Sequence, residues 1–264
     1  METEKETTDC NLIIQSDRTF AIYTLAQPEN ALPELTLQYY HSSKALDNIT
    51  RVRLLDAQAT ILFAHNFVEM FALGTQESKR VFCKEEECLL YSGDIDVRRG
   101  LVAAGTVFRV LLVWNSATGD ILHKLKGHTG VIFDAYFLRA KTGGIFVGSV
   151  SDDRSVRVWK DDSQVAILFG HSSRIWKLAQ IEGDTTEGQI AIASVSEDAT
   201  CRVWKVNTSG VGDESRELVN LRGHLGKNVR GVSALGDFLA TGGEDGGVKV
   251  WNLAKLLQSN QIKD

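Results

Sequence analysis

Hydrophobic and polar residues alternate in short segments along most of this chain. In Ser155–Trp159 (SVRVW) the pattern is that of a β-strand that buries one of its two faces. Leu101–Gly105 and Val110–Trp114 predict two neighbouring strands, and Ile49–Leu73 predicts three more. The chain has 23 glycines and only two prolines, which suits many short strands joined by glycine turns. We therefore predict an all-β fold.

Three landmarks recur along the chain at matching spacings. Tryptophans close four of the alternating segments at intervals of 45, 45 and 47 residues, at Trp114, Trp159, Trp204 and Trp251. Gly-His pairs stand at Gly127-His128, Gly170-His171 and Gly223-His224. An aspartate lies six residues before the Trp in three repeats, at Asp153, Asp198 and Asp245. A period of about 40–45 residues is that of a four-stranded blade in a β-propeller.

These landmarks resemble the WD-repeat family, whose blades are tied by a hydrogen-bond relay of His, Asp, Ser or Thr, and Trp. A buried indole N–H and a buried imidazole need partners, which the Asp and the hydroxyl supply. The resemblance implies a first relay of His128, Ser151, Asp153 and Trp159. It implies a second relay of His171, Ser196, Asp198 and Trp204. A third has His224, Asp245 and Trp251, with Gly243 at the serine position, so we expect it to be weaker.

The chain is predicted to form a single WD40-type β-propeller domain over residues 1–264, with about six recognisable blades. Degenerate blades occupy about residues 10–90, where the landmarks fade, and clear repeats occupy about residues 91–253. Residues 254–264 are predicted to be a frayed or truncated C-terminus.

The two ends of the predicted ring depart from the repeat. Leu12–Ile14 and Phe20–Tyr23 predict strands of a first blade, and Phe108 stands where a later blade would carry its Asp. A fourth strand is expected after Trp251, but Leu253–Gln258 has a helical or frayed pattern. The ring is therefore expected to be either incomplete or closed by an N-terminal strand. We expect the chain to be the first part of a longer protein or a shortened gene product.

Charge and cysteine usage narrow the class of protein. The net charge is −5 and no run of basic residues occurs, so strong independent RNA binding is not indicated, although an RNA partner is not excluded. Cys83 and Cys88 flank an acidic stretch, Lys84–Glu87, which we interpret as a surface loop. Free thiols in a reducing compartment are favoured over a metal site for the four cysteines. With no signal core or long apolar run, we expect a soluble cytoplasmic protein with no membrane association.

The segments between the landmarks resemble a more specific family. Among them are AGTVFRVLLVW, GHTGVIFDAYF, SEDATCRVW and TGGEDGGVKVWNL. From about residue 95 to 253 they resemble the N-terminal propeller of the eukaryotic WD-repeat family that partners a tRNA 2′-O-ribose methyltransferase. The resemblance implies a non-catalytic subunit that directs ribose methylation of wobble nucleotide 34 in the anticodon loop. The partner enzyme would bring the S-adenosylmethionine site, since this chain has no Gly-rich nucleotide loop that follows a strand and opens a helix.

The alternative is a general protein-interaction scaffold, for instance in ubiquitin ligation or trafficking. Relay residues are common to all WD propellers, so they do not separate the two functions, whereas the segments between them favour the first. An enzyme in its own right has no support, because no nucleophile elbow, zinc spacing or paired-carboxylate motif is present. The repeat spacing of the three Gly-His histidines favours a structural role over catalysis. No metal and no cofactor are expected on this chain.

Candidate partner-binding residues follow from aligning the repeats on their Gly-His pairs. Phe133, Trp176 and Arg230 then share one position, directly after a buried residue of the first strand of each blade. We expect this position near the rim of the central channel, and aromatic and Arg side chains are what binding hot spots favour. Core packing is the competing explanation for Trp176. Arg174 and Lys227 are expected at the same blade ends, as phosphate contacts or as solvated charges.

Overall fold

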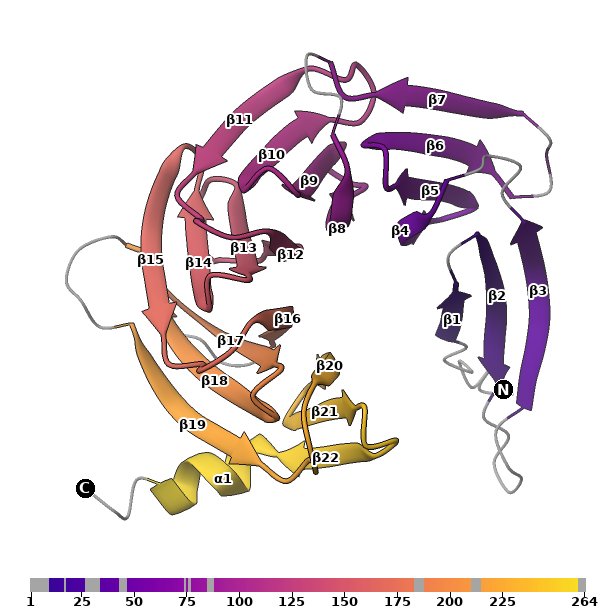
Figure 1. Cartoon of the computed structure of the whole chain (residues 1–264). Helices are drawn as coiled ribbons and strands as arrows, with labels where there is room; N and C mark the ends of the chain where they lie inside the picture. Colours follow the sequence, from indigo (N-terminus) through magenta and orange to yellow (C-terminus); the bar gives the residue numbers. More distant parts are fainter. Residues whose placement is uncertain are drawn as a thin grey trace, which may run out of the picture.

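The computed structural model of the chain describes residues 10–16, 18–26, 34–42, 47–73, 75, 77–84, 88–182, 188–209 and 215–260. Over these residues it contains twenty-two strands in six antiparallel sheets, followed by one helix. Figure 1 shows the sheets side by side around a central channel, as the blades of a β-propeller. The prediction of six blades in an all-β fold is therefore confirmed.

The six blades follow the order of the chain, and in each the first strand lies innermost (Figure 1). Blade one contains β1 (Cys10–Gln15), β2 (Thr19–Ala26) and β3 (Glu34–Ser42). Blade two contains β4 (Ile49–Leu55), β5 (Gln58–Phe63), β6 (Phe67–Ala72) and β7 (Ser78–Phe82). Blade three contains β8 (Leu90–Asp96), β9 (Leu101–Thr106), β10 (Val110–Asn115) and β11 (Ile121–Lys126).

The C-terminal half repeats the same plan. Blade four contains β12 (Ile132–Leu138), β13 (Phe146–Ser151), β14 (Ser155–Lys160) and β15 (Ser163–Phe169). Blade five contains β16 (Ile175–Ile181), β17 (Gln189–Ser196), β18 (Thr200–Asn207) and β19 (Arg216–Arg222). Blade six contains β20 (Val229–Leu235), β21 (Phe238–Gly243) and β22 (Val248–Asn252).

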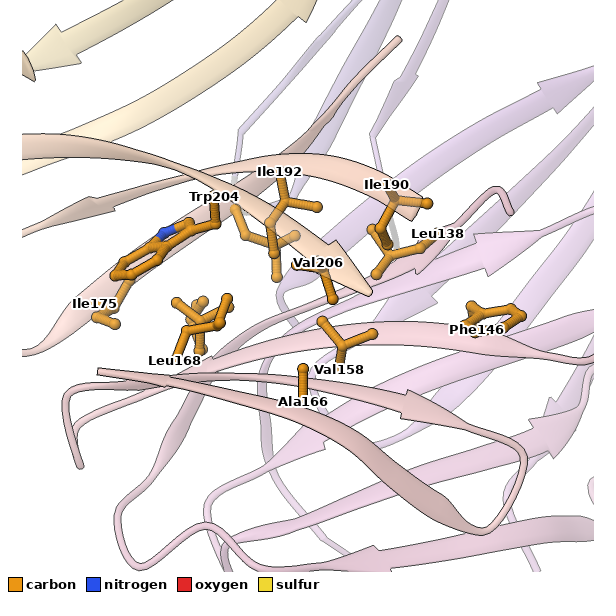
Figure 2. Packing of buried hydrophobic residues seen from close by; sticks show 13 residues of the cluster. Leu138, Phe146, Val158, Ala166, Leu168, Ile175, Ile190, Ile192, Trp204 and Val206 are labelled. Atoms are coloured by element: carbon orange, nitrogen blue, oxygen red, sulfur yellow. The ribbon is translucent and has the colours of Figure 1, made fainter. Parts of the chain in front are cut away.

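The hydrophobic core lies between successive blades. Val156 and Val158 on β14 are buried against Ile192 and Trp204 of blade five, in one continuous apolar cluster (Figure 2). The alternation seen in the sequence is explained by this arrangement, since each blade is a sheet that packs one face on each neighbour. Fully burying a valine side chain contributes about 1.5–3 kcal/mol, so the blade-to-blade contacts dominate the stability of the ring.

Acidic side chains on the innermost strands add polar links between blades. Asp94 on β8 accepts a hydrogen bond from the backbone N–H of Phe137 at 3.1 Å, one blade further on. Asp134 on β12 accepts one from the backbone N–H of Leu178 in blade five at 3.2 Å. Both carboxylates are buried, and the Arg51 guanidinium lies 3.4 Å from Asp134. These bonds satisfy buried charge while fixing the spacing of the inner strands.

The pairing register shows which strand each three-stranded blade lacks. In blades three to five the register shifts near the start of the innermost strand, as between Ile132 and Asp134, and again beside the tryptophan of the third strand. Blade one has only the second shift, between Ile22 and Tyr23, so β1–β3 correspond to the second to fourth strands. Blade six has the first shift, so β20–β22 correspond to the first to third strands.

One face of blade six is uncovered by any described part of the chain. Its apolar side chains Val248 and Val250 are 75% and 66% exposed. The equivalent residues of blade four, Val156 and Val158, are both 0% exposed because blade five lies on them. In Figure 1 this face borders the opening of the ring, opposite blade one. The predicted N-terminal strand therefore does not close the ring among the described residues.

The segment after Trp251 is helical, which was one of the two predicted alternatives. Helix α1 (Leu253–Asn260) begins where the Asn252 side chain accepts a hydrogen bond from the Lys255 backbone N–H at 3.0 Å, as an N-cap. Leu253 is buried in a cluster with Val203 and Leu221 of blade five. Among the described residues, no helix has the length and apolar character needed to cross a membrane.

Matched valine substitutions test the packing of the two blade faces. We expect Val158→Thr to lower the free energy of unfolding by about 1–3 kcal/mol, because it buries a hydroxyl without a partner. Val250→Thr changes an exposed residue of the same type and is expected to stay within about 0.5 kcal/mol. Urea unfolding of both variants measures the difference, and equal losses would show that the blade-six face is covered in solution.

Candidate functional site

The landmark residues of blade four meet in one buried hydrogen-bond relay. The His128 ring lies with Nδ1 2.8 Å from Asp153 Oδ2 and with Nε2 2.8 Å from Ser149 Oγ. The Trp159 Nε1–H donates to the same Ser149 oxygen at 2.9 Å. The structure thus brings His128, Asp153 and Trp159 together around one serine. This connects the loop before β12 to strands β13 and β14.

Blade five contains the same arrangement. His171 lies 2.9 Å from Asp198 through Nδ1 and 2.9 Å from Ser194 Oγ through Nε2. The Trp204 Nε1–H donates to Ser194 Oγ at 2.8 Å. The Asp198 carboxylate also accepts the backbone N–H of Ser172 at 3.0 Å, which fixes the loop that precedes β16.

The relay hydroxyls differ from those predicted. Ser151 and Ser196 contact neither the histidine nor the tryptophan; each accepts the backbone N–H of the relay aspartate, at 3.1 Å in both blades. Ser149 and Ser194 lie two residues earlier on the same strands and take the predicted role. Residues i and i+2 point to the same face of a strand, so the sequence pattern offered both serines and only the distance separates them.

The third relay has a shared hydroxyl, which was predicted to be missing, although Gly247 stands where Ser155 and Thr200 add a second hydroxyl in the other two blades. His224 Nε2 lies 2.8 Å from Thr241 Oγ1, and the Trp251 Nε1–H donates to the same oxygen at 3.0 Å. His224 Nδ1 lies 3.0 Å from Asp245. Gly243 is not a missing hydroxyl, since a Cβ at this position would lie 2.5 Å from His224 Nδ1. The hydroxyl stands at Thr241, two residues before Gly243, as in the other blades.

The chemistry of the relay is structural. Burial lowers the pKa of His128, and the hydrogen bond to Asp153 only partly offsets this. Burial alone would raise the pKa of Asp153, but bonds from His128 and Ser155 outweigh it and the pKa lies well below its usual range. Because the Asp153 carboxylate can only accept, His128 donates to it through Nδ1–H. Nε2 of the neutral ring is then an acceptor, so the Ser149 hydroxyl donates to it while accepting from Trp159. Both nitrogens of His128 are therefore engaged in the relay, and this ring does not present a base to solvent.

Two earlier blades replace the relay with other contacts, which the sequence pattern did not reveal. In blade three the Trp114 Nε1–H donates to Asn66 Oδ1 at 3.1 Å, and Asn66 Nδ2 donates to the Cys88 sulfur at 3.3 Å. In blade two Phe71 takes the tryptophan position and stacks on the His41 ring at 5.1 Å. The signal for Asn66 is its place in the turn between the second and third strands, where the later blades carry Asp.

A repeated bulge sets the residues that face the channel mouth. In blades two to six the pairing register skips the second residue of the innermost strand. One side chain per blade is thereby released from the ladder near the loops that precede these strands. These residues are Thr50, Tyr91, Phe133, Trp176 and Arg230. We call the last four, which touch one another, the mouth arc.

The members of the mouth arc stack from blade to blade. The Tyr91 ring lies 5.2 Å from that of Phe133, and the Phe133 ring lies 4.7 Å from that of Trp176. The Arg230 guanidinium sits 3.7 Å from the centroid of Trp176. Phe133, Trp176 and Arg230 were predicted, and the structure brings them together. Tyr91 was missed, although it follows Leu90 as Phe133 follows Ile132.

The cations beside the mouth arc have acidic partners. Arg174 Nε lies 3.0 Å from Glu197 and 3.4 Å from Asp152, and its guanidinium is 5.5 Å from the Trp176 ring. Arg230 lies 2.7 Å from Glu244. Lys227 is exposed in the loop before β20. The Ser173 hydroxyl, followed by the charges of Arg174, Lys227 and Arg230, lowers the pKa of Glu197. Three cations thus face three carboxylates, and the local charge is balanced.

The cysteines and the other possible metal ligands do not form a reactive or metal-binding site among the described residues. The side chains of Cys83, Cys88 and Cys201 are buried. Burial, with the Asp198 charge, raises the pKa of Cys201 far above its usual value. Within the described ranges no three His, Cys, Asp or Glu side chains are placed to hold a metal ion. Of the acidic stretch Lys84–Glu87, residues 85–87 lie outside the described residues.

The six blades and their relays define the class of this protein: it is a β-propeller that carries WD40 repeats. The model of the WD domain, G-beta repeat, matches residues 119–160, 162–205 and 215–252. The solved structure of U3-55K superposes with a TM-score of 0.64 at 20% identity, over 80% of this chain and 63% of that one. The computationally designed Ika8 protein gives a TM-score of 0.61 at 20% identity, over 91% and 70%. Both likenesses concern the fold alone.

Curated proteins with a similar sequence fall into two groups. The tRNA (34-2'-O)-methyltransferase regulator WDR6 of Mus musculus is 29% identical over 232 residues, 79% of this chain. The protein of the same name from Rattus norvegicus is 30% identical over 231 residues, 78% of this chain. WD repeat and SOCS box-containing protein 1 of Takifugu rubripes is 35% identical over 82 residues, 30% of this chain. The matched segment covers 19% of the length of each of these relatives.

Two serine variants separate the observed relay from the predicted one. Ser194→Ala leaves the buried Trp204 and His171 nitrogens without their shared partner, so we expect a loss of about 2–4 kcal/mol in unfolding free energy. Ser196→Ala removes bonds to the backbone groups of Arg174 and Asp198, residues that are not fully buried, and we expect a loss of about 1 kcal/mol. Thermal and urea unfolding measure both. A larger loss for Ser196→Ala would mean that the relay passes through the other serine.

Proposed function

We propose that this chain is a non-catalytic WD-repeat subunit that partners a tRNA 2′-O-methyltransferase and directs ribose methylation of wobble nucleotide 34. The observation that carries the proposal is the extent of the similarity to the regulators of that name. It covers 78–79% of the chain, which is more than residues 119–160, 162–205 and 215–252, the segments that match the WD40 repeat model. A likeness that extends beyond the shared relay residues reflects more than a common fold.

The described side chains support an accessory role. The histidines that recur in the repeats are buried and occupied by their relays, so none is available as a general base. The partner enzyme would supply S-adenosylmethionine and the reacting groups. This chain would supply a rigid surface, and tRNA would be bound through the complex in the cytoplasm.

A general protein-interaction scaffold is the alternative function. The observation that favours it is the similarity to WD repeat and SOCS box-containing protein 1, at 34–35% identity. That similarity covers about 30% of the chain, against 78–79% for the methyltransferase regulators. The longer match is therefore the better guide to function.

Nucleoside mass spectrometry of tRNA from cells lacking this gene tests the proposal. We expect 2′-O-methylation at position 34 to fall to background, with neighbouring anticodon-loop modifications intact, because the partner enzyme loses the subunit that places its substrate. Re-expression of the unaltered chain in the deletion strain is the control and is expected to restore the modification. Full methylation at position 34 in the deletion strain would contradict the proposed function and favour the general scaffold.

A further inference from the structure

The mouth arc continues into an exposed apolar surface on blade three. Tyr91 is 60% exposed, and Phe108 and Leu89 are 64% and 47% exposed. The loops that carry the last two lie together, because the Val107 backbone N–H donates to the Leu89 carbonyl at 3.1 Å. Large exposed aromatic groups that lie next to one another mark interaction sites in soluble proteins.

Phe108 shows that this surface is specific to blade three. It occupies the position at which blades four and five carry the relay aspartates Asp153 and Asp198. Those carboxylates face inward to a histidine, whereas the Phe108 side chain points to solvent. Blade three fixes its tryptophan through Asn66 instead, so the residue at position 108 is not needed for a relay. An exposed phenylalanine at a site released from the relay is better explained by binding than by folding.

The other end of the mouth arc is ordered before any partner arrives. The Trp176 Nε1–H donates to Asn228 Oδ1 at 2.9 Å, and Asn228 Nδ2 donates to Glu244 at 2.6 Å. Glu244 also accepts a hydrogen bond from Arg230 Nε at 2.8 Å, and Arg230 covers the Trp176 ring. Side chains fixed in this way lose little conformational entropy on binding. A preorganised tryptophan and arginine, with charged groups around them, match the composition of a protein–protein hot spot.

The charge balance argues against nucleic acid as the ligand of this surface. Arg174 and Arg230, with Lys227 nearby, face the carboxylates of Asp152, Glu197 and Glu244, so phosphate would have to displace an existing ion pair. RNA affinity depends on unpaired cations that release counterions from the backbone. A protein partner needs no such excess of positive charge.

We propose that the mouth arc, with Phe108 and Leu89, is the docking surface for the catalytic methyltransferase subunit, which inserts apolar or aromatic side chains against Tyr91 and Phe133. This inference rests on the proposed function for the identity of the partner. It assigns protein binding to this face of the propeller and leaves the RNA to other surfaces of the complex.

Titration calorimetry of the purified chain with the purified methyltransferase subunit tests the surface. We expect Tyr91→Ala and Trp176→Ala each to raise Kd at least about tenfold, as loss of a hot-spot aromatic does. Phe169→Ala is the matched control, because Phe169 is 66% exposed on the outer strand β15, away from the mouth arc. Its Kd is expected to be unchanged. Tyr91→Ala removes a largely exposed ring, so it keeps the test valid if Trp176→Ala lowers the melting temperature.

Anticodon stem-loop RNA, titrated into the same variants at two salt concentrations, completes the experiment. Unchanged RNA binding alongside weakened methyltransferase binding supports the proposal. Weakened RNA binding with intact methyltransferase binding overturns it in favour of an RNA site. Unchanged binding of both partners by both arc variants overturns it as well, while the position-34 measurement in the deletion strain stands as a separate result. If the unaltered chain does not bind the methyltransferase, this docking surface is wrong, and the methylation measurement alone decides the proposed function.

Discussion

The packing of each blade on the next is the constraint on which this structure depends. A four-stranded sheet has two faces and cannot bury both of them alone, so each blade needs a neighbour on either side. The cluster around Val158 and Trp204 shows this, since seven of its members come from blade four and six from blade five. The strong preference for Val, Ile and Leu at alternate positions follows from the same requirement, because these side chains fill the space between twisted sheets.

The relays solve a second problem that this packing creates. Blades three to six each carry a large indole into the inter-blade layer, and its N–H must find an acceptor there. Ser149, Ser194 and Thr241 provide one oxygen that serves the indole and the histidine together. In blade three the indole N–H of Trp114 donates instead to the side-chain amide of Asn66, which belongs to the preceding blade. Blade three is therefore not an unsatisfied copy of the later blades, because it uses a different side chain for the same buried donor.

The strand pairing within each blade also determines which side chains form the mouth arc. The pairing register skips one residue near the start of the innermost strand in each of blades two to six. Each of these blades therefore has one residue there that is not paired with the neighbouring strand. That position carries Thr50 in blade two, an aromatic residue in blades three to five and Arg230 in blade six. A repeat fold thus offers one residue per blade, at a fixed place, that strand pairing does not restrict, and this suits the partner binding proposed above.

The sequence by itself predicted the repeat, a ring of about six blades and several of the strands. The spacing of Trp159, Trp204 and Trp251 is an intrinsic property of the chain, and period-2 alternation has one simple structural reading. It did not determine which serine joins the relay, because the side chains of Ser149 and Ser151 point to the same face of one strand. The two serines differ only in their distance to Trp159. It also gave no sign that Tyr91 stacks on Phe133, since the two lie on different blades and meet through the bulges.

The exposed face of blade six marks the limit of inference from sequence. Val248 and Val250 have the same pattern as Val156 and Val158, and the pattern alone predicts that all four are buried. Only the tertiary structure decides otherwise, because burial in a propeller depends on whether another blade lies against the face. Local pattern fixes which side of a strand is apolar, whereas the presence of a neighbour, and with it the burial and the contacts of each side chain, is a property of the assembled ring.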